Sequence, residues 1–196
     1  MRVISGTAKG RQLKGPPGTG TRPMTDRLKT SLFDTLVPYG IGGARVLDLY
    51  AGSGSLGIEM LSRGADWCDF VEQNAGVCRV IRENLQITRL AEKARVHQMP
   101  VARYIGLIKD VSGTPPYDII TLDPPYADPD IEKTLEQVAG WPMLADGGII
   151  VIGHATQVKL ADEYGGRIKR TKHRVMGGSA FSIYEVGDRR PTTDDI

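Results

Sequence analysis

The sequence predicts an α/β fold in which a mostly parallel sheet carries helices on both faces. From Arg45 onward, short apolar runs alternate with amphipathic stretches, which is the pattern of successive β–α–β units. The runs 46–49 and 117–122 are rich in leucine and β-branched residues, as expected for strands buried on both faces. With 196 residues, the chain is long enough for one substantial core and too short for two ordinary domains.

The first 37 residues precede this alternation. Residues 2–4 and 11–13 have the pattern of two short strands, and the glycine- and proline-rich stretch 15–20 is typical of a loop. Apolar residues then recur at helical spacing between 25 and 37, with Thr25 or Asp26 available as the N-cap. We therefore predict a basic N-terminal extension (1–37, a short hairpin plus a helix), a main domain (38–187) and a flexible tail (188–196).

The elements of the main domain follow from the same periodicities. The expected strands cover 45–49, 67–71, 94–99, 117–122, 148–152, 167–175 and 180–186, and the expected helices cover 55–62, 74–87 and a stretch marked by Ile131, Leu135 and Val138. The last two strands are joined around Gly177 and Gly178. His154 follows the fifth strand without a partner, and we assign it no role.

The first strand of the main domain ends in a carboxylate and breaks into glycines. Gly52, Gly54 and Gly57 form a GxGxxG pattern, which allows a tight turn into a helix whose N-terminus faces a nucleotide-type cofactor. A dinucleotide is one reading, but Asp48 would repel its pyrophosphate. The carboxylate instead suits a ligand with an ammonium group, such as the methionine end of S-adenosylmethionine. Glu72, at the tip of the next strand, is placed to accept hydrogen bonds from ribose hydroxyls.

The strand over 117–122 delivers a second carboxylate to the same edge of the sheet. It ends in Asp123-Pro124-Pro125-Tyr126. Prolines have no N–H, so their carbonyls are rigid acceptors beside the Asp123 carboxylate, and acceptors without donors suit an amine. Tyr126 adds a flat face on which a base can stack. The sequence thus predicts a site for an amino-bearing base.

Charge is unevenly spread along the chain. The whole chain carries +2, whereas residues 1–30 hold seven basic residues against Asp26 alone. A basic segment of this kind points to a polyanionic partner, with a solvated arm as the alternative. No apolar run approaches the length of a membrane span and the N-terminus is too polar for a signal peptide, so we expect a cytoplasmic protein. Cys68 and Cys78 lack partners at metal-ligand spacing and are expected to be reduced thiols in or near the core.

Taken together, these residues resemble a known family. The Asp48 to Gly57 loop with Asp123-Pro124-Pro125-Tyr126 looks like the class I methyltransferases that act on exocyclic amines of bases. The opening Arg2 to Gly6 and the segment Thr21-Arg22-Pro23-Met24-Thr25-Asp26-Arg27 are similar to the RsmD family, which methylates the N2 amine of a guanine in 16S ribosomal RNA. The similarity runs over nearly the whole chain.

The resemblance implies a Rossmann-like class I methyltransferase fold, with a mostly parallel seven-stranded sheet closed by an antiparallel strand pair. It implies S-adenosyl-L-methionine as cofactor and 16S rRNA as partner, free or in an assembling small subunit, with no metal and no required oligomer. The implied site residues are Asp123, Pro124 and Tyr126 for catalysis, Asp48, Tyr50, Gly52, Gly54, Glu72 and Asp123 for the cofactor, and Arg22, Arg27, Arg11 and Lys9 for RNA.

Other interpretations also fit parts of the sequence. Relatives commonly have a small polar or acidic residue where Met99-Pro100 stands, which leaves adenine recognition open. An adenine-N6 methyltransferase shares related motifs, an NAD-linked oxidoreductase fits the glycine pattern, and an RNA-binding protein without catalysis fits the basic arm. The basic residues between Arg167 and Arg174 are either a second phosphate-binding strip or the polar face of an edge strand.

Overall fold

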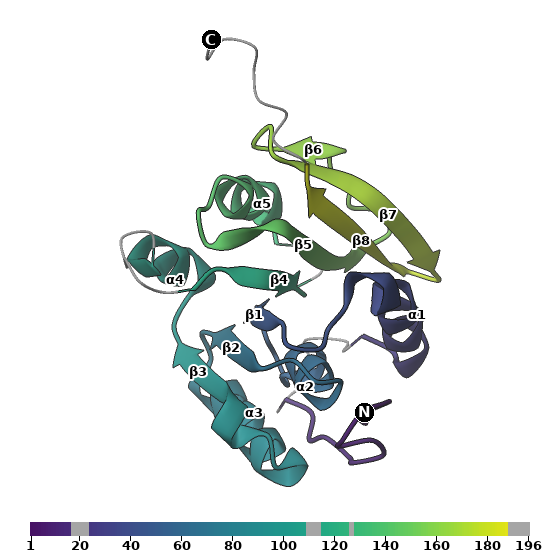
Figure 1. Ribbon diagram of the computed structural model, residues 1–196, viewed down its shortest axis with the longest axis vertical. Helices are drawn as coiled ribbons and strands as arrows, with labels where there is room; N and C mark the ends of the chain where they lie inside the picture. The colour runs from purple at the N-terminus through teal and green to yellow at the C-terminus, as the bar shows by residue number, and fades with distance from the viewer. Residues whose placement is uncertain (17–23, 109–114, 126–127, 188–196) are drawn as a thin grey trace.

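The computed structural model describes residues 1–16, 24–108, 115–125 and 128–187. Figure 1 shows a single twisted sheet with helices on both sides. The eight strands lie in the order β3-β2-β1-β4-β5-β8-β7-β6. Their bounds are β1 Arg45–Leu49, β2 Trp67–Glu72, β3 Ala94–Gln98, β4 Tyr117–Leu122, β5 Leu144–Ala155, β6 Glu163–Tyr164, β7 Ile168–Met176 and β8 Ser179–Val186.

The sheet is parallel on one side and antiparallel on the other. β3, β2, β1, β4 and β5 pair in parallel, so their carboxyl ends share one edge, which we call the carboxyl edge. β8 is antiparallel to β5, and β7 is antiparallel to β8. β7 therefore runs in the same direction as β5 and also ends at the carboxyl edge.

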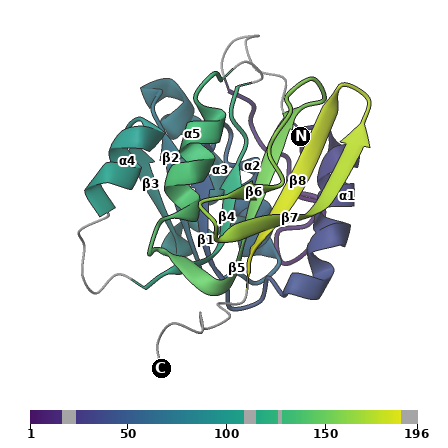
Figure 2. The same cartoon turned by 90° about the horizontal axis from the view of Figure 1, so that it is seen from above.

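Helices cover both faces of the sheet. They are α1 Asp26–Leu36, α2 Ser55–Ser62, α3 Ala75–Thr88, α4 Val101–Ile108 and α5 Ile131–Ala139, with short 3-10 turns η1 Val37–Tyr39 and η2 Ala91–Lys93. The first three pack into one hydrophobic cluster and the last two into another, on the opposite face. Figure 2 shows α1 beside β7 and β8, with α4 and β3 at the other side of the molecule.

The predicted architecture is confirmed, with four differences. β5 covers Leu144–Ala155 instead of 148–152, so His154 lies within the strand. The sheet has eight strands instead of seven, because the two-residue β6 pairs with the start of β7. The expected N-terminal strands are reduced to one isolated bridge, Arg2 to Gln12. The helix α4 was not expected, because Pro100 interrupts the pattern before it; the Pro100 carbonyl accepts the amides of Arg103 and Tyr104, so the proline starts the helix.

Residues 1–16 do not form a free arm. Val3, Ala8 and Leu13 are buried in the same cluster as the helices α1 and α2. The segment is also tied by hydrogen bonds to α3, where the buried Asn84 side chain accepts the Lys14 amide at 2.8 Å. The extension and the main domain therefore share one core.

Local signals explain where the first helices begin. Thr25 accepts the Leu28 amide at 3.2 Å and is the N-cap of α1, and Asn74 does the same for α3 through the Val77 amide. Within the described residues, no helix is long and apolar enough to cross a bilayer.

Candidate active site

The turn after β1 has the backbone that its glycines allow. Gly52 and Gly54 have φ of 53° and 75°, a region that residues with a Cβ rarely adopt. A Cβ on Gly57 would lie 2.4 Å from the Phe70 ring, so this glycine lets α2 approach the sheet closely. A Cβ on Gly52 would meet only the Tyr50 carbonyl oxygen, at 3.9 Å, which leaves the outer side of the turn open to a ligand.

Asp48 lies beneath this turn. Its side chain is 1% exposed, and it accepts the Gly57 amide at 3.0 Å and the Thr121 hydroxyl at 2.6 Å. Burial raises the pKa of Asp48 to about 7, against the lowering effect of these two hydrogen bonds. The carboxylate thus joins β1, β4 and the first turn of α2, and both its oxygens are used inside the protein.

Glu72 flanks the same turn from the end of β2. Its carboxylate accepts the amides of Gly52, at 3.2 Å, and Asn74, at 2.8 Å. The side chain is half-buried, so each oxygen retains a lone pair for a further donor. This carboxylate and the open Gly52 turn together fit an adenosine cofactor whose ribose hydroxyls approach along the carboxyl edge.

Asp123 follows β4, which pairs directly with β1. Its side chain is half-buried, and burial raises the pKa of Asp123 to about 6. Gly153 of the neighbouring strand β5 makes room for it, since a Cβ there would lie 2.6 Å from the Asp123 Oδ1 atom and 3.2 Å from the Met24 methyl group. Met24 therefore brings the start of α1 to the same carboxylate.

The structure describes only some of the other residues predicted to contact the cofactor or the base. Tyr50 has φ of 57° and its hydroxyl lies 3.3 Å from the Thr134 hydroxyl of α5. Pro124 directly follows Asp123 at the carboxyl edge. Tyr126 and Arg22 lie outside the described residues. On the expected adenine side, the Met99 amide donates to the Glu72 carbonyl, so this amide is already used.

The basic residues expected to bind RNA lie at both edges of the sheet. Arg27 is exposed in the first turn of α1, near the carboxyl edge. The turn that carries Lys9 packs on Ser62, the last residue of α2, and Arg11 donates to the Ile87 carbonyl in the last turn of α3. Both helices run away from the carboxyl edge, so Lys9 lies about 12 Å from it, the length of α2. The Arg11 guanidinium lies at the far end of the longer helix α3.

Comparison with known proteins decides the family. A family model described as "Conserved hypothetical protein 95" matches residues 1–185. YlbH of Bacillus subtilis (strain 168) is 39% identical over 186 residues, which cover 94% of this chain and 98% of that protein. The Escherichia coli (strain K12) protein named ribosomal RNA small subunit methyltransferase D is 36% identical over 152 residues, or 78% of this chain and 73% of that protein. The chain belongs to the RsmD family.

Solved structures have the same architecture as this RsmD-family chain. A hypothetical protein of Thermus thermophilus is 30% identical, with a TM-score of 0.80 over 95% of this chain and 99% of that chain. An RNA methyltransferase from Salinibacter ruber, solved with S-adenosyl-L-homocysteine, has a TM-score of 0.61 over 89% of this chain and 100% of that chain. At 15% identity, the second likeness shows the fold alone. The class I methyltransferase fold expected from the sequence is confirmed.

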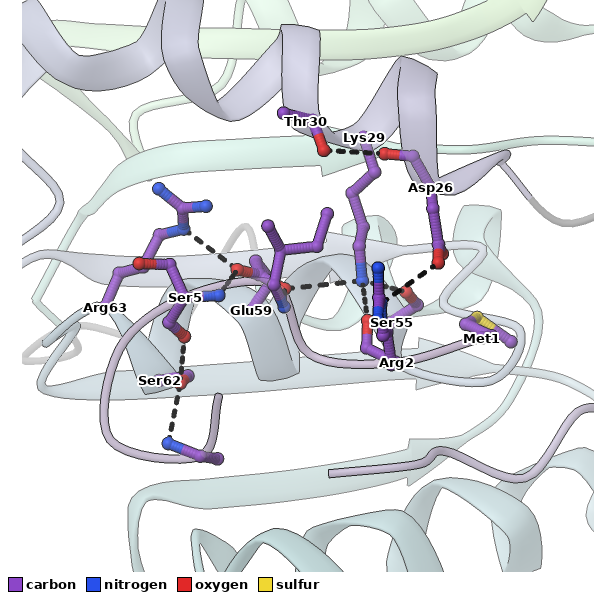
Figure 3. A network of polar contacts seen from close by, with 12 residues as sticks. Met1, Arg2, Ser5, Asp26, Lys29, Thr30, Ser55, Glu59, Ser62 and Arg63 are labelled. Atoms are coloured by element: carbon purple, nitrogen blue, oxygen red, sulfur yellow. Dashed lines mark hydrogen bonds and ion pairs between the residues drawn. The ribbon is translucent and has the colours of Figure 1, made fainter. Parts of the chain in front are cut away.

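Sequence reasoning missed a buried ion pair behind the site, drawn in Figure 3. Lys29 and Glu59 are both 0% exposed, and their charged atoms lie 3.3 Å apart. Lys29 also donates to the Arg2 carbonyl and to the Ser55 hydroxyl, at the start of α2. Glu59 accepts the amides of Ile4 and Ser5. A lysine on the apolar face of a predicted helix, next to Leu28, was the signal that could have revealed this network.

The basic stretch of β7 divides into two parts. Arg167 donates to three carbonyls, those of Ala139, Trp141 and Leu144, which closes the carboxyl end of α5. Arg170 pairs with Asp162, and Lys169 lies 3.6 Å from Glu163. Lys172 and Arg174 are exposed and make no side-chain hydrogen bond or ion pair with any described residue. The early residues of the strip are thus bound within the protein, whereas the last two are not.

A cavity of about 340 Å³ opens at the opposite edge of the sheet. It is lined by Gly43, Asp118 and Gly148, among others, near the amino ends of β1, β4 and β5. Asp48 and Asp123 do not contribute to its lining. The candidate site is therefore defined by the convergence of strand ends at the carboxyl edge, where open α/β folds bind their ligands.

Proposed function

We propose that this protein transfers a methyl group from S-adenosylmethionine to the N2 amine of a guanine in 16S ribosomal RNA. The observation that carries the proposal is the pairing of β1 with β4. It sets the glycine turn and the Asp123-Pro124-Pro125 segment side by side at the carboxyl edge. A cofactor on the turn would then present its methyl group to an amine held by Asp123. The name of the E. coli relative, ribosomal RNA small subunit methyltransferase D, supports methyl transfer to small-subunit rRNA.

The cofactor supplies an electrophilic methyl group on a sulfonium. In the reaction the carbon–sulfur bond breaks, a carbon–nitrogen bond forms, the neutral thioether product leaves, and the amine loses a proton to solvent. The chain's own task is to hold the amine in line with the methyl group, because orientation removes much of the entropic barrier. Asp123 and the Pro124 carbonyl accept hydrogen bonds from the amine and stabilise the positive charge that grows on it. Tyr126 stacks on the base.

The cofactor residues take distinct roles in this proposal. Gly52, Gly54 and Tyr50 shape the turn, Glu72 would accept hydrogen bonds from the ribose hydroxyls, and Asp123 would lie beside the methyl group. Asp48 contributes through the turn that it holds and through its charge, since its oxygens already bind Gly57 and Thr121. A cation at the site would favour the ionised form of Asp48.

RNA binding is assigned to basic residues of the N-terminal extension. Arg22 and Arg27 lie in sequence on either side of Met24, whose methyl group reaches the space beside Asp123. We assign them to phosphates close to the target nucleotide, and Lys9 and Arg11 to phosphates farther along the RNA. Because Val3, Ala8 and Leu13 are core residues, these assignments must be tested by point substitutions and not by deleting the extension.

The experiment that tests the proposal incubates the protein with labelled S-adenosylmethionine and unmethylated small-subunit rRNA or subunits, followed by digestion to nucleosides. Label in N2-methylguanosine is expected. Label in N6-methyladenosine would instead support the adenine enzyme. Absence of label from both substrates, with the cofactor bound, would contradict methyl transfer to rRNA.

The cofactor assignment has its own test, Glu72→Gln. The amide keeps the shape of the side chain but loses an acceptor and the charge, and a hydrogen bond of a charged group is worth about 1.5–3 kcal/mol. Calorimetry should show cofactor affinity weakened roughly tenfold or more, with RNA affinity retained. Glu83→Gln, on the exposed side of α3, is the matched control, because Glu83 only pairs with Lys14 at the surface.

A further inference from the structure

Arg174 lies in the same row of the sheet as the Asp123 carboxylate. Leu122 pairs with Ile152, which places Asp123 beside Gly153. Gly153 pairs with Phe181 of β8, and Phe181 pairs with Arg174 of β7. Three strand spacings separate Asp123 from Arg174, a distance of about 14 Å. The end of β7 is thus within a few nucleotides of the proposed target base.

The two positions also share a face of the sheet. A Cβ on Gly153 would meet both Asp123 and Met24, so the Asp123 carboxylate lies on the face that α1 covers. Phe181 is buried in the cluster formed with α1, and its cross-strand partner Arg174 lies on the same face. Lys172, opposite Ile183 of the same cluster, follows the same alternation.

The positive charges on the carboxyl half of β7 are not paired with carboxylates of the described residues. On the amino half of β7, the nearby carboxylates Glu163 and Asp162 neutralise Lys169 and Arg170. Glu185 of β8 accepts the hydroxyls of Tyr39 and Thr171. Beyond Thr171, Lys172 and Arg174 are exposed without an acidic partner among the described residues.

We propose that Lys172 and Arg174 form a second RNA contact, which binds the phosphates of the strand that leaves the target nucleotide along the carboxyl edge. This inference rests on the proposed rRNA function and adds a surface on the side of Asp123 opposite the glycine turn that follows β1. Two exposed cations on the face of the target carboxylate, with Arg174 in its row, match a polyanion whose reactive base is held at Asp123. Their contacts fix where the RNA lies and carry no information about base sequence.

The test is the double variant Lys172→Ala/Arg174→Ala with an unmethylated 16S rRNA fragment as the probe. Each phosphate contact contributes about 0.7–0.9 to the slope of log affinity against log salt. The variant should therefore lose roughly 1.5 from the slope and bind RNA roughly tenfold or more weakly at 0.1 M salt. Its KM for RNA should rise, while kcat at saturating RNA and the Kd for S-adenosylmethionine stay unchanged.

The matched control is Lys93→Ala/Lys169→Ala, which removes the same charge at the other edge of the sheet. Both lysines are about half exposed or more and pair with surface carboxylates, so their loss costs little stability. The control should keep the RNA slope of the wild type. Equal slopes for the β7 variant and the wild type, in a wild type that methylates the RNA, would overturn this inference alone. A wild type that binds the cofactor but methylates no RNA would overturn the proposed function.

Discussion

Two strands that pair with each other end in carboxylates with opposite surroundings. Asp48 is 1% exposed and has an internal donor on each oxygen, whereas Asp123 is half-buried and faces a gap left by Gly153. Burial raises the pKa of both carboxyls, to about 7 for Asp48 and about 6 for Asp123. The difference teaches that position at the carboxyl edge does not by itself make a carboxylate a ligand contact. One of the pair holds the site together and the other is available to a substrate.

The largest effect should follow from Asp123→Ala. If this carboxylate stabilises charge on the target amine, its loss removes a preorganised electrostatic contact, which typically costs 10²–10³ in rate. Single-turnover methylation at saturating cofactor should fall at least a hundredfold, with the cofactor Kd measured by calorimetry nearly unchanged. Asp118→Asn, at the other end of β4, is the control. Loss of cofactor binding with an unchanged turnover would reverse the two roles.

Asp48→Asn should act on stability instead. The folded protein keeps a proton on Asp48 that the unfolded chain releases between about pH 4 and pH 7, so ionisation lowers the free energy of unfolding as pH rises through this range. An asparagine can still accept the Gly57 amide and has no proton to release. Urea unfolding should show the free energy of unfolding of the variant rising relative to that of the wild type between about pH 4 and pH 7, by a few kcal/mol at most. Parallel stability curves would contradict the assignment.

Gly153→Ala tests the gap beside Asp123. The added methyl group would lie 2.6 Å from Oδ1, so the carboxylate must move, and displacement of about 1 Å can cost up to a hundredfold in rate. We expect a tenfold or greater loss of turnover with cofactor affinity retained. Gly106→Ala in α4, where an added Cβ meets nothing within 4 Å, should leave turnover unchanged.

The smallest effect is the pH dependence. The proposed role of Asp123 requires its ionised form, so kcat/KM should rise with pH through about 6 and be roughly tenfold below its plateau at pH 5. The same rise is expected in Asp48→Asn, because the two carboxyls have separate roles. A profile that becomes flat in that variant would assign the titration to Asp48.

Much of this organisation follows from sequence. The strands β1 and β4 and the helix α2 have the predicted bounds, because glycines and charged residues interrupt apolar runs sharply at their ends. The edge that carries Asp48, Glu72 and Asp123 follows from parallel pairing. Both cysteines are buried free thiols, as expected.

The rest depends on contacts between distant residues, which no local pattern encodes. The requirement for glycine at position 153 arises only when β5 packs beside β4, because a side chain there would collide with Asp123. Lys29 stands on the apolar face of its predicted helix, but its partner Glu59 is identified only in the folded chain. The sequence also does not distinguish Arg167, which binds carbonyls within the protein, from the exposed Arg174. This difference depends on which carbonyls and carboxylates surround each end of β7.

The contacts of the N-terminal segment have a consequence for synthesis on the ribosome. The Lys14 amide donates a hydrogen bond to Asn84, which lies 70 residues farther along the chain. The amides of Ile4 and Ser5 donate to Glu59, which lies more than 50 residues after them. At about 5–20 residues per second, Asn84 is added roughly 4–14 s after Lys14. Through that interval the Lys14 amide lacks its partner, so the N-terminal segment completes its contacts only after α3 has been made.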